Sequence, residues 1–322
     1  MSRRRRSSRA PPIPQERRRD PAAAPQLYQL EQFTRADLTR WHSLSERLDE
    51  FNREYYFSLE SQRAARRPQI LDALRQRPAA SLQLSQWVRI VPYRYCLEPL
   101  SPLGSVRGYG GRFNIGREVG EGGFRFFPAL YLASNFQTAY REFHGLDRSS
   151  TKDGLTPEEL SLGSPDGFLV AKFDGRIQSV FDTRDPDALR PFVEIIRSFE
   201  ISPRVRQLAR QLKMRDLELV RTVGRLQRVL AAKDWRALPA QFDIPAPPQI
   251  FGQLLRDAGY EAIVYPSARN DERCVALFPE NFRTSESYLR VTGDYPHAIT
   301  APTLDSETAG GLLAECYAVP TE

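Results

Sequence analysis

GYGGRFNIG (residues 108–116) and PALYLASNFQTAYREF (residues 128–143) are the two stretches that decide how this chain is interpreted. The glycines of the first stretch allow tight turns and a close approach of the backbone to a ligand. Arg112 and Asn114 follow directly, so a guanidinium and a side-chain amide stand beside this flexible backbone. The first stretch therefore predicts a turn that can hold an anionic or polar ligand.

The second stretch predicts a strand followed by a helix. Residues 130–133 alternate as the two faces of a strand do, with Tyr131 among them. Ser134 or Asn135 is a suitable N-cap for a helix that carries Glu142. The junction is expected to bring the arginine, the tyrosine and the glutamate of the two stretches toward one crevice.

Length and composition bound the class of protein. A chain of 322 residues that is 41% hydrophobic can bury a large core in one domain or two. No apolar run approaches the roughly 20 residues of a membrane helix, and no apolar segment follows the basic start as in a secretory signal. Three distant cysteines, Cys96, Cys274 and Cys316, have no CxxC spacing. We expect a soluble cytoplasmic protein without a membrane partner, a disulfide framework or a zinc site.

The net charge of +6 belongs to the first 20 residues, which hold eight arginines and two acidic residues. The rest of the chain carries 38 of the 46 basic groups and 38 of the 40 acidic groups, so the folded body is expected to be neutral. A like-charge block of this kind is typical of a solvated, disordered end. The alternative is a tail that binds nucleic acid or an acidic partner.

The rest of the chain shows further patterns of helix and strand. Apolar residues in steps of three and four predict a long helix from Leu30 and a short one after Pro68. The glycine-rich segment 117–127 predicts a hairpin or flap, and the last 25 residues are expected to be loosely ordered. Further strands are predicted at 87–91, 168–173 with 179–181, 262–265, 274–278 and 288–291, and further helices at 185–199, 203–232 and 250–258, the last closed by Gly259.

Several common chemistries have no sequence support. There is no GxGxxG after a strand, no GxxxxGK[ST], no GxSxG and no HExxH, which argues against a dinucleotide fold of the Rossmann type, a phosphate-binding P-loop, a nucleophile elbow and a zinc protease. The only histidines, His42, His144 and His297, are far apart in sequence. A histidine-based triad or metal cluster is therefore not expected.

Four short motifs occur in an order that resembles the RES-domain family, the toxin halves of many RES–Xre toxin–antitoxin pairs. They are GGRFN (110–114), ALYLAS (129–134), AYRE (139–142) and YPSAR (265–269). The resemblance covers 86–143 and 251–282. It implies an α+β, ADP-ribosyltransferase-like core and an enzyme that degrades NAD⁺, its substrate, by phosphorolysis or hydrolysis, with inorganic phosphate as a potential co-substrate and no metal.

The resemblance also implies roles for individual residues. The residues it implies for catalysis are Arg89, Glu142 and Ser267, and those for binding NAD⁺ are Arg89, Arg112, Asn114, Tyr131 and Ser267. Arginine clamps phosphate oxygens, tyrosine offers a face for nicotinamide, and a carboxylate stabilises positive charge that develops on the ribose. The ordinary alternatives are a solvent-facing Arg89, an Arg112 that ties down the turn, a plain strand tyrosine, a solvated Glu142 and a Ser267 that only forms a turn.

The expected organisation places the RES core in two pieces. Its segments are a disordered arginine-rich tail (1–25), a helical arm (26–85), the first part of the core (86–145), a mainly helical insertion (146–250), the second part of the core (251–295) and a C-terminal tail (296–322). The fold class is α+β, with mixed or antiparallel sheets and flanking helices around this core.

The function expected from the resemblance is a toxin that cleaves the nicotinamide–ribose bond of NAD⁺, as an NAD⁺ phosphorylase or glycohydrolase, and is restrained by a cognate Xre-type antitoxin. A protein ADP-ribosyltransferase on the same fold is the first alternative. A non-catalytic protein that associates with nucleic acid, through the arginine-rich tail or only indirectly, is the second. Whether the chain forms a homo-oligomer is left open.

Overall fold

The computed structural model describes residues 35–76, 80–146, 167–214, 217, 219–293, 295 and 298–318. The arginine-rich tail expected at 1–25 lies outside these residues. The chain divides between Glu46 and Arg47 into two units, and the packing described below lies within the second unit. No helix in the described part of the chain is long and apolar enough to cross a membrane.

The described residues form both helices and strands. The helices are α1 (Arg35–Ala65), α2 (Arg67–Arg75), α3 (Phe136–His144), α5 (Pro186–Ile196), α6 (Pro203–Gln211), α7 (Val223–Leu230), α8 (Ala237–Phe242), α9 (Pro247–Asp257) and α10 (Ala309–Tyr317). The strands are β1 (Ala80–Pro92), β2 (Leu130–Ala133), β3 (Phe168–Asp182), β4 (Ala262–Pro266), β5 (Arg273–Leu277), β6 (Tyr288–Thr292) and β7 (Thr303–Leu304). The expected α+β fold class is confirmed.

The strands form one sheet in the order β1-β2-β5-β4-β3-β6-β7. An additional antiparallel pairing joins β1 to β3 along most of both strands, with Arg89 opposite Ala171 and Trp87 opposite Phe173. Because β3 also pairs in parallel with β4, the strands β1, β2, β5, β4 and β3 close into a ring. Apart from the consecutive strands β4 and β5, neighbouring strands of this ring are far apart in sequence, so it depends on long-range pairing.

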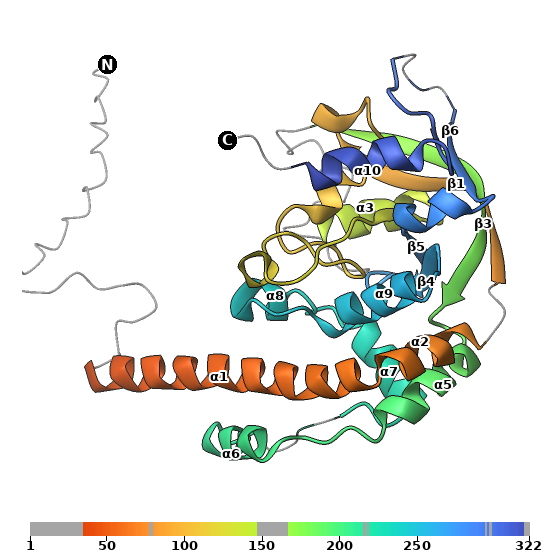
Figure 1. Ribbon diagram of the computed structural model, residues 1–322. Coiled ribbons are helices and arrows are strands. Elements are labelled where there is room, and N and C mark those ends of the chain that lie inside the picture. Colours follow the sequence, from red (N-terminus) through yellow and green to blue (C-terminus); the bar gives the residue numbers. More distant parts are fainter. Residues whose placement is uncertain are drawn as a thin grey trace, which may run out of the picture. The chain divides into compact units, whose positions relative to one another are not determined.

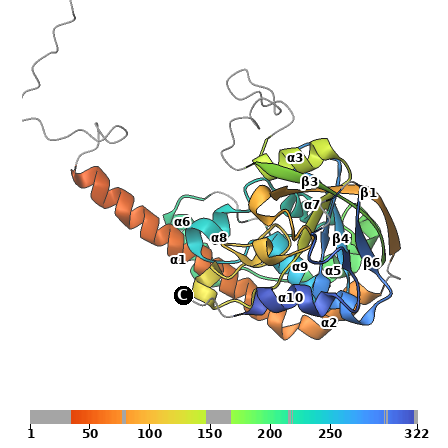
Figure 2. The ribbon, with the colours of Figure 1, turned by 90° about the horizontal axis from the view of Figure 1, so that it is seen from above.

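Two hydrophobic cores lie on the two faces of the strands. On one face, α2, α5, α7 and α9 pack against them, and Phe251 of α9 contacts Phe181 of β3 and Phe192 of α5. On the other face, Trp87 and Phe173 pack with residues of α10. Figure 1 shows α10 on the opposite side of the strands from α5 and α7, and Figure 2 shows α3 beside β1.

Local capping explains where the helices of the site begin and end. The Asn135 side chain accepts a hydrogen bond from the amide of Thr138 at the start of α3, and Gly145 takes a left-handed conformation after its last residue. Asp185 caps α5 in the same way and Pro186 occupies its first turn. Of the two caps predicted for the Glu142 helix, Ser134 and Asn135, the structure uses Asn135.

The single helix predicted at 203–232 is wrong. The chain forms α6 and α7 instead, because Lys213 adopts a left-handed conformation after α6 and Thr222 caps a new helix by accepting from the amide of Arg225. The strand expected at 168–173 continues as one strand through 179–181, so the second segment extends the first rather than pairing with it. This strand lies within the range expected as an insertion, 146–250, and pairs with β1, so part of that range belongs to the sheet.

Two further expectations differ from the structure. The segment 117–127, expected as a hairpin or flap, forms a short 3₁₀ turn and loops rather than a hairpin; Val119 is buried and the amide of Gly120 donates to Asp243. The C-terminal residues expected to be loosely ordered contain β7 and α10, with Leu313 and Cys316 fully buried. Their buried apolar side chains hold this end against the second core.

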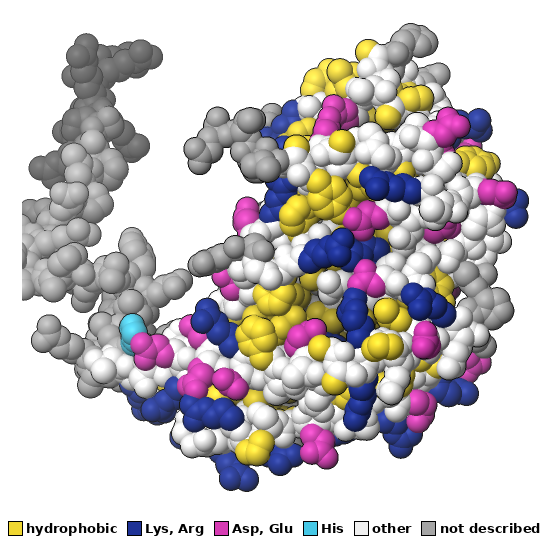
Figure 3. Space-filling model, in the orientation of Figure 1, with side chains coloured by type: hydrophobic (Ala, Val, Ile, Leu, Met, Phe, Trp, Pro, Cys, Tyr) yellow, Lys and Arg dark blue, Asp and Glu magenta, His cyan; other side chains and the backbone are white. Residues whose placement is uncertain are grey.

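Charge over the body of the molecule is mixed. On the face seen in Figure 3, Lys and Arg side chains are interspersed with Asp and Glu. Several of the surface pairs are helical neighbours, such as Arg190 with Asp187 and Arg197 with Glu194. This distribution agrees with the equal numbers of basic and acidic groups beyond residue 20.

Candidate active site

A pocket of about 220 Å³ lies where the glycine-rich turn, α3 and the strands β1, β2, β4 and β5 meet. On β2, Leu130 belongs to the core beyond the sheet, whereas its neighbour Tyr131 lines the pocket. Its walls are formed by Val88, Arg89, Ile90, Gly111, Arg112, Tyr131, Leu132, Ala133, Ala139, Glu142, Phe143, Trp235, Arg236, Tyr265, Arg269 and Cys274.

Glu142 and Ser267 are in direct contact although 125 residues separate them. The hydroxyl of Ser267 donates to Glu142 Oε1 at 2.5 Å, and the amide of Ala268 donates to the same oxygen at 3.1 Å. Ser267 is 1% exposed, so this contact is shielded from water. Two donors on one oxygen fix the carboxylate in place and leave its second oxygen for the pocket.

The turn after β4 is tied to α3 at a second point. The side-chain amide of Asn270 donates to Thr138 Oγ1 at 2.9 Å, and Thr138 is fully buried. Within the turn, the amide of Arg269 donates to Ser267 Oγ at 3.0 Å. The serine hydroxyl is thus both acceptor and donor, which orients its proton toward Glu142.

Tyr131 is held by the glycine-rich turn. Its hydroxyl donates to Asn114 Oδ1 at 2.7 Å and accepts from the amide of Phe113 at 3.0 Å. Burial raises the pKa of this hydroxyl well above its ordinary value, so the ring is neutral. A Cβ on Gly111 would lie 2.4 Å from the Tyr131 hydroxyl oxygen, so only glycine leaves room for the ring.

Asn114 does not line the pocket but holds Tyr131, which does. It is 0% exposed, and its Nδ2 donates to the carbonyls of Ser105 and Phe127. Its Oδ1 accepts from the amide of Gly111 as well as from Tyr131. All its polar atoms are occupied within the protein, which makes it a positioning residue for Tyr131 rather than a direct ligand contact.

Gln249 of α9 fixes the same turn from the other side, and sequence reasoning missed it. Its Nε2 lies within hydrogen-bond distance of the carbonyls of Tyr109, Asn114 and Gly111, at 2.7, 3.0 and 3.2 Å. Its Oε1 accepts from the amide of Ala246. Buried backbone carbonyls need such partners, but a lone glutamine at a helix start gives no sign in the sequence of what it will contact.

Arg112 is a buried cation of the pocket. It is 7% exposed, and its NH1 donates to the Leu230 carbonyl at 3.4 Å, which is a long hydrogen bond. Its guanidinium lies 5.9 Å from the ring centroid of Tyr265. No carboxylate of the described residues forms an ion pair with it. A buried guanidinium with most of its donors unused is suited to an anionic ligand.

Arg89 is placed differently from the expected anion clamp. It belongs to the wall of the pocket, but its NH1 donates to the carbonyls of Pro99 and Ser101, at 2.7 and 3.1 Å. Burial lowers its pKa to about 10. The guanidinium therefore fastens the loop after β1, and a direct role with a ligand remains a prediction.

Two arginines that sequence reasoning did not single out complete the pocket. Arg269 follows Ser267 by two residues, and Arg236 comes from the segment between α7 and α8. The pKa of Arg236 is lowered by burial and by the charges of Arg269 and Arg112, while Glu142 opposes this effect. Three guanidiniums beside one carboxylate leave the pocket positively charged, and an anionic ligand would relieve their repulsion.

Aromatic side chains supply flat walls. Trp235 is buried, and the guanidinium of Arg236 lies over its ring, 4.7 Å from the centroid. Tyr265 is buried, with a pKa raised well above its ordinary value by burial. No three His, Cys, Asp or Glu side chains in the described part of the chain gather as a metal site would require. The pocket thus combines a fixed carboxylate, cations and aromatic faces.

Comparison with known proteins identifies one family. The model of the RES domain matches residues 192–296, a range that includes Ser267 and begins within α5, inside the segment expected as an insertion. A chain of the crystal structure of the M. tuberculosis MbcT–MbcA toxin–antitoxin complex matches with a TM-score of 0.39 and 15% identity, over 76% of this chain and 97% of that chain. No curated protein matches the sequence. The expected resemblance to the RES-domain family is confirmed for residues 192–296, where the family model matches.

Proposed function

We propose that this protein cleaves the nicotinamide–ribose bond of NAD⁺, as a phosphorylase or glycohydrolase, and that a cognate Xre-type antitoxin restrains it. The observation that carries the proposal is the Glu142 carboxylate, which Ser267 and the Ala268 amide hold at a pocket that also contains Tyr131 and Arg112. The RES domain supports the same assignment. The proposal thus includes NAD⁺ as the substrate and the antitoxin as the partner.

Glu142 would act on the ribose. As the bond between the ribose carbon and the nicotinamide nitrogen breaks, its electron pair leaves with neutral nicotinamide and positive charge develops on the sugar. A carboxylate fixed beside the sugar stabilises that charge without first reorganising. The free Oε2 of Glu142 would hold a ribose hydroxyl or face the developing charge, while Ser267 keeps Oε1 in position.

The arginines would hold the anionic part of the substrate. Arg112 and Arg269 line the pocket together with Arg236, and NAD⁺ carries a pyrophosphate with two negative charges. Guanidinium groups bind phosphate oxygens through paired hydrogen bonds. At about 220 Å³ the pocket suits the nicotinamide riboside end, with the neutral ring of Tyr131 as a face against which the nicotinamide can stack.

The acceptor completes the reaction. An oxygen of inorganic phosphate or of water forms the new bond to the ribose carbon, giving ADP-ribose 1-phosphate or ADP-ribose, and the proton of the attacking group is released to Glu142 or to solvent. The surplus of positive charge around Glu142 would favour an anionic acceptor over water. No metal is needed for this chemistry.

Product analysis tests the proposal directly. The purified full chain is incubated with NAD⁺ labelled in the adenosine, with and without inorganic phosphate, and the products are separated. Release of nicotinamide with ADP-ribose 1-phosphate supports phosphorolysis, and release with ADP-ribose alone supports hydrolysis. Label that stays on a macromolecule would favour the ADP-ribosyltransferase alternative. NAD⁺ that stays intact in every condition would refute the proposed activity.

A further inference from the structure

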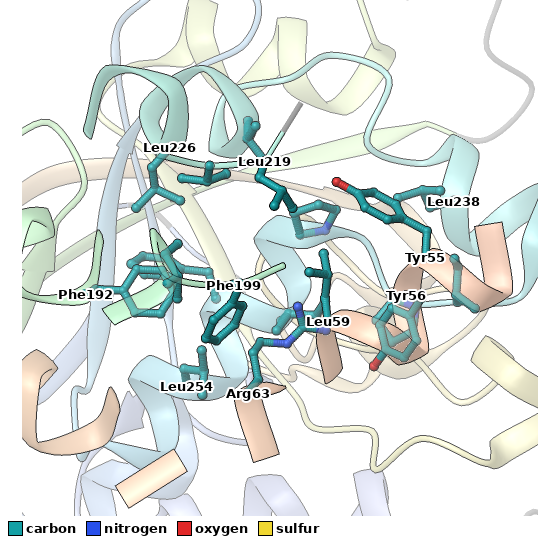
Figure 4. A pocket seen from close by; sticks show the side chains of 18 of the residues that line it. Tyr55, Tyr56, Leu59, Arg63, Phe192, Phe199, Leu219, Leu226, Leu238 and Leu254 are labelled. Atoms are coloured by element: carbon teal, nitrogen blue, oxygen red, sulfur yellow. The ribbon is translucent and has the colours of Figure 1, made fainter. Parts of the chain in front are cut away.

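A second pocket of about 270 Å³ lies away from the candidate active site. None of its lining residues belongs to the first pocket. Helices α1, α5, α7 and α9 contribute to it, and Figure 4 shows the labelled side chains around one open space, with Arg63 reaching toward Leu59. Apart from Asn52 and Arg63 its lining is apolar, and it includes Tyr55, Tyr56, Leu59, Leu219 and Val229.

Few polar groups face this apolar pocket. The side-chain amide of Asn52 donates a hydrogen bond to the Leu48 carbonyl in the same helix. Arg63 lies 2.7 Å from Glu60 and places its guanidinium 5.5 Å from the ring centroid of Tyr56. A pocket of this size with an apolar lining and polar groups at one side has the composition of sites that bind small ligands.

Basic side chains border the apolar pocket at Leu219. This residue also lines a neighbouring hollow of about 560 Å³, together with four arginines of α6, α7 and the residues before α7. Besides Leu219, the residues that line this basic hollow are Glu200, Ile201, Arg206, Leu217, Arg221, Thr222, Arg225 and Arg228. No carboxylate of the described residues forms an ion pair with Arg206, Arg221 or Arg228. Among its described residues, the basic hollow thus has one glutamate and four arginines.

Tyr55 lies near cations of both regions. Its ring lines the apolar pocket, and its pKa is raised by burial while Arg225, Arg63 and Arg221 act in the opposite direction. Cations that influence a hydroxyl in this way lie near it, so their field reaches the side of the apolar pocket. An apolar body in the pocket would thus carry any attached anionic group toward the arginines.

We propose that this composite site binds an amphiphilic anion, a ligand with an aliphatic body in the apolar pocket and one carboxylate or phosphate head at the arginines of the basic hollow. The aliphatic body is favoured because the pocket offers almost only carbon surface. The anionic head is favoured by charge complementarity with Arg206, Arg221 and Arg228. A free fatty acid and an acylated phosphate share this chemistry.

Calorimetric titration of the purified full chain with straight-chain probes tests the proposal. We expect decanoate to bind at one saturable site and to bind more tightly than octanoate by about fourfold for each added methylene. Decanol, which lacks the charge, should bind at least fivefold more weakly than decanoate, and decyl phosphate should compete with decanoate. Decanol that binds as tightly as decanoate, or no saturable binding of either, would overturn the proposal.

Two variants locate the site. Arg221→Ala should weaken decanoate about fivefold and leave decanol unchanged, whereas Arg190→Ala, an exposed arginine paired with Asp187, should change neither. Val229→Phe should weaken both probes by filling the apolar pocket, and its thermal unfolding midpoint shows whether the fold is intact. Decanoate affinity that is the same in all three variants would refute this location. The readout is binding alone, so it does not depend on NAD⁺ cleavage.

Discussion

The two pockets are close in size and opposite in chemistry. The active site, at about 220 Å³, is lined by four arginines and Glu142, and the apolar pocket, at about 270 Å³, is lined mainly by carbon. In the first, hydrogen bonds from outside the cavity hold the carboxylate and the tyrosine, as Ser267 holds Glu142 and Asn114 holds Tyr131. In the second, only packing sets the shape. Single polar substitutions should therefore disable the first pocket, whereas changes of volume should disable the second.

The largest effect is expected for Glu142→Gln. Its amide oxygen can still accept from Ser267 and Ala268, but the group no longer carries the charge that stabilises the transition state. NAD⁺ cleavage should fall by on the order of 10³-fold with little change in KM. Turnover is measured by nicotinamide release.

Glu194→Gln is the matched control, because this carboxylate lies exposed on α5 and pairs only with Arg197 among the described residues. It should keep full turnover. Decanoate binding should be equal in both variants, since neither glutamate lines the apolar pocket. A Glu142→Gln protein that retains turnover would remove this carboxylate from the mechanism.

Gly111→Ala should be the next largest effect. The added Cβ would meet the hydroxyl and ring of Tyr131 at 2.4 to 2.6 Å, and Tyr131 is fixed by Asn114 and Phe113. We expect a loss of about 2 kcal/mol in the free energy of unfolding and reduced turnover. Urea unfolding measures the first quantity.

Gly104→Ala is the control, because nothing lies within 4 Å of its added Cβ. It should unfold at the wild-type midpoint. If Gly111→Ala were as stable as Gly104→Ala, Tyr131 would have room to move, and the rigid aromatic wall we infer for the active site would be wrong.

Arg236→Ala should have a smaller effect, on substrate binding. Burial and the charges of Arg269 and Arg112 lower the pKa of Arg236, so its charge is disfavoured in the empty pocket and its removal should not destabilise the protein. We expect KM for NAD⁺ to rise about tenfold, with a smaller change in kcat. Steady-state kinetics tests this, with Arg190→Ala as the exposed control. An unchanged KM would place the pyrophosphate elsewhere.

The smallest effect of a single residue concerns alkaline pH and the buried tyrosines of the two pockets. Burial raises the pKa of Tyr131 in the active site and raises that of Tyr56 in the apolar pocket to about 12. An unfolded tyrosine loses its proton near pH 10. Above that pH the folded state binds more protons, so these residues stabilise the fold below about pH 10 and lose that contribution as pH rises.

Arg89 acts with the opposite sign, because its folded pKa of about 10 lies below the unfolded value and the unfolded state then binds more protons. Since several tyrosines have raised pKa values, we expect the free energy of unfolding to fall between about pH 9 and about pH 11, by about 1 kcal/mol for each such tyrosine. Urea unfolding at both pH values measures it. Tyr56→Phe should reduce the fall and the exposed Tyr288→Phe should not; equal slopes would contradict this account.

Elements with local signals could be predicted from the sequence. The strand of Tyr131, the helix of Glu142 and the helix before Gly259 combine apolar period with a cap or a glycine, and each of these signals acts within a few residues. The break after α6 could not, because apolar spacing continues across Lys213 and the left-handed turn there depends on how α6 packs. The spacing of the apolar residues alone therefore does not reveal the break.

The candidate site divides in the same way. Arg112, Tyr131, Glu142 and Ser267 stand in motifs, and the structure brings all four to one place. Trp235 and Arg236 lie in a segment without a motif, and only the packing of α7 and α8 brings them to the pocket. The role of Asn114 as a support was hidden as well, because residue type does not reveal whether an amide faces a ligand or the protein interior.

The closed ring of strands has a consequence for the synthesis of this protein. The ribosome delivers β1 and β2 first, and β4, β5 and the turn between them, which supply Tyr265, Cys274 and Ser267 to the site, only after β3 and the helices α5 to α9. Pairing between such distant segments is slow to form, and the ring cannot close before β5 has emerged. A nascent chain therefore has no assembled active site until that point. If the proposed activity is harmful to the cell that makes it, the fold itself delays that harm until β5 is in place.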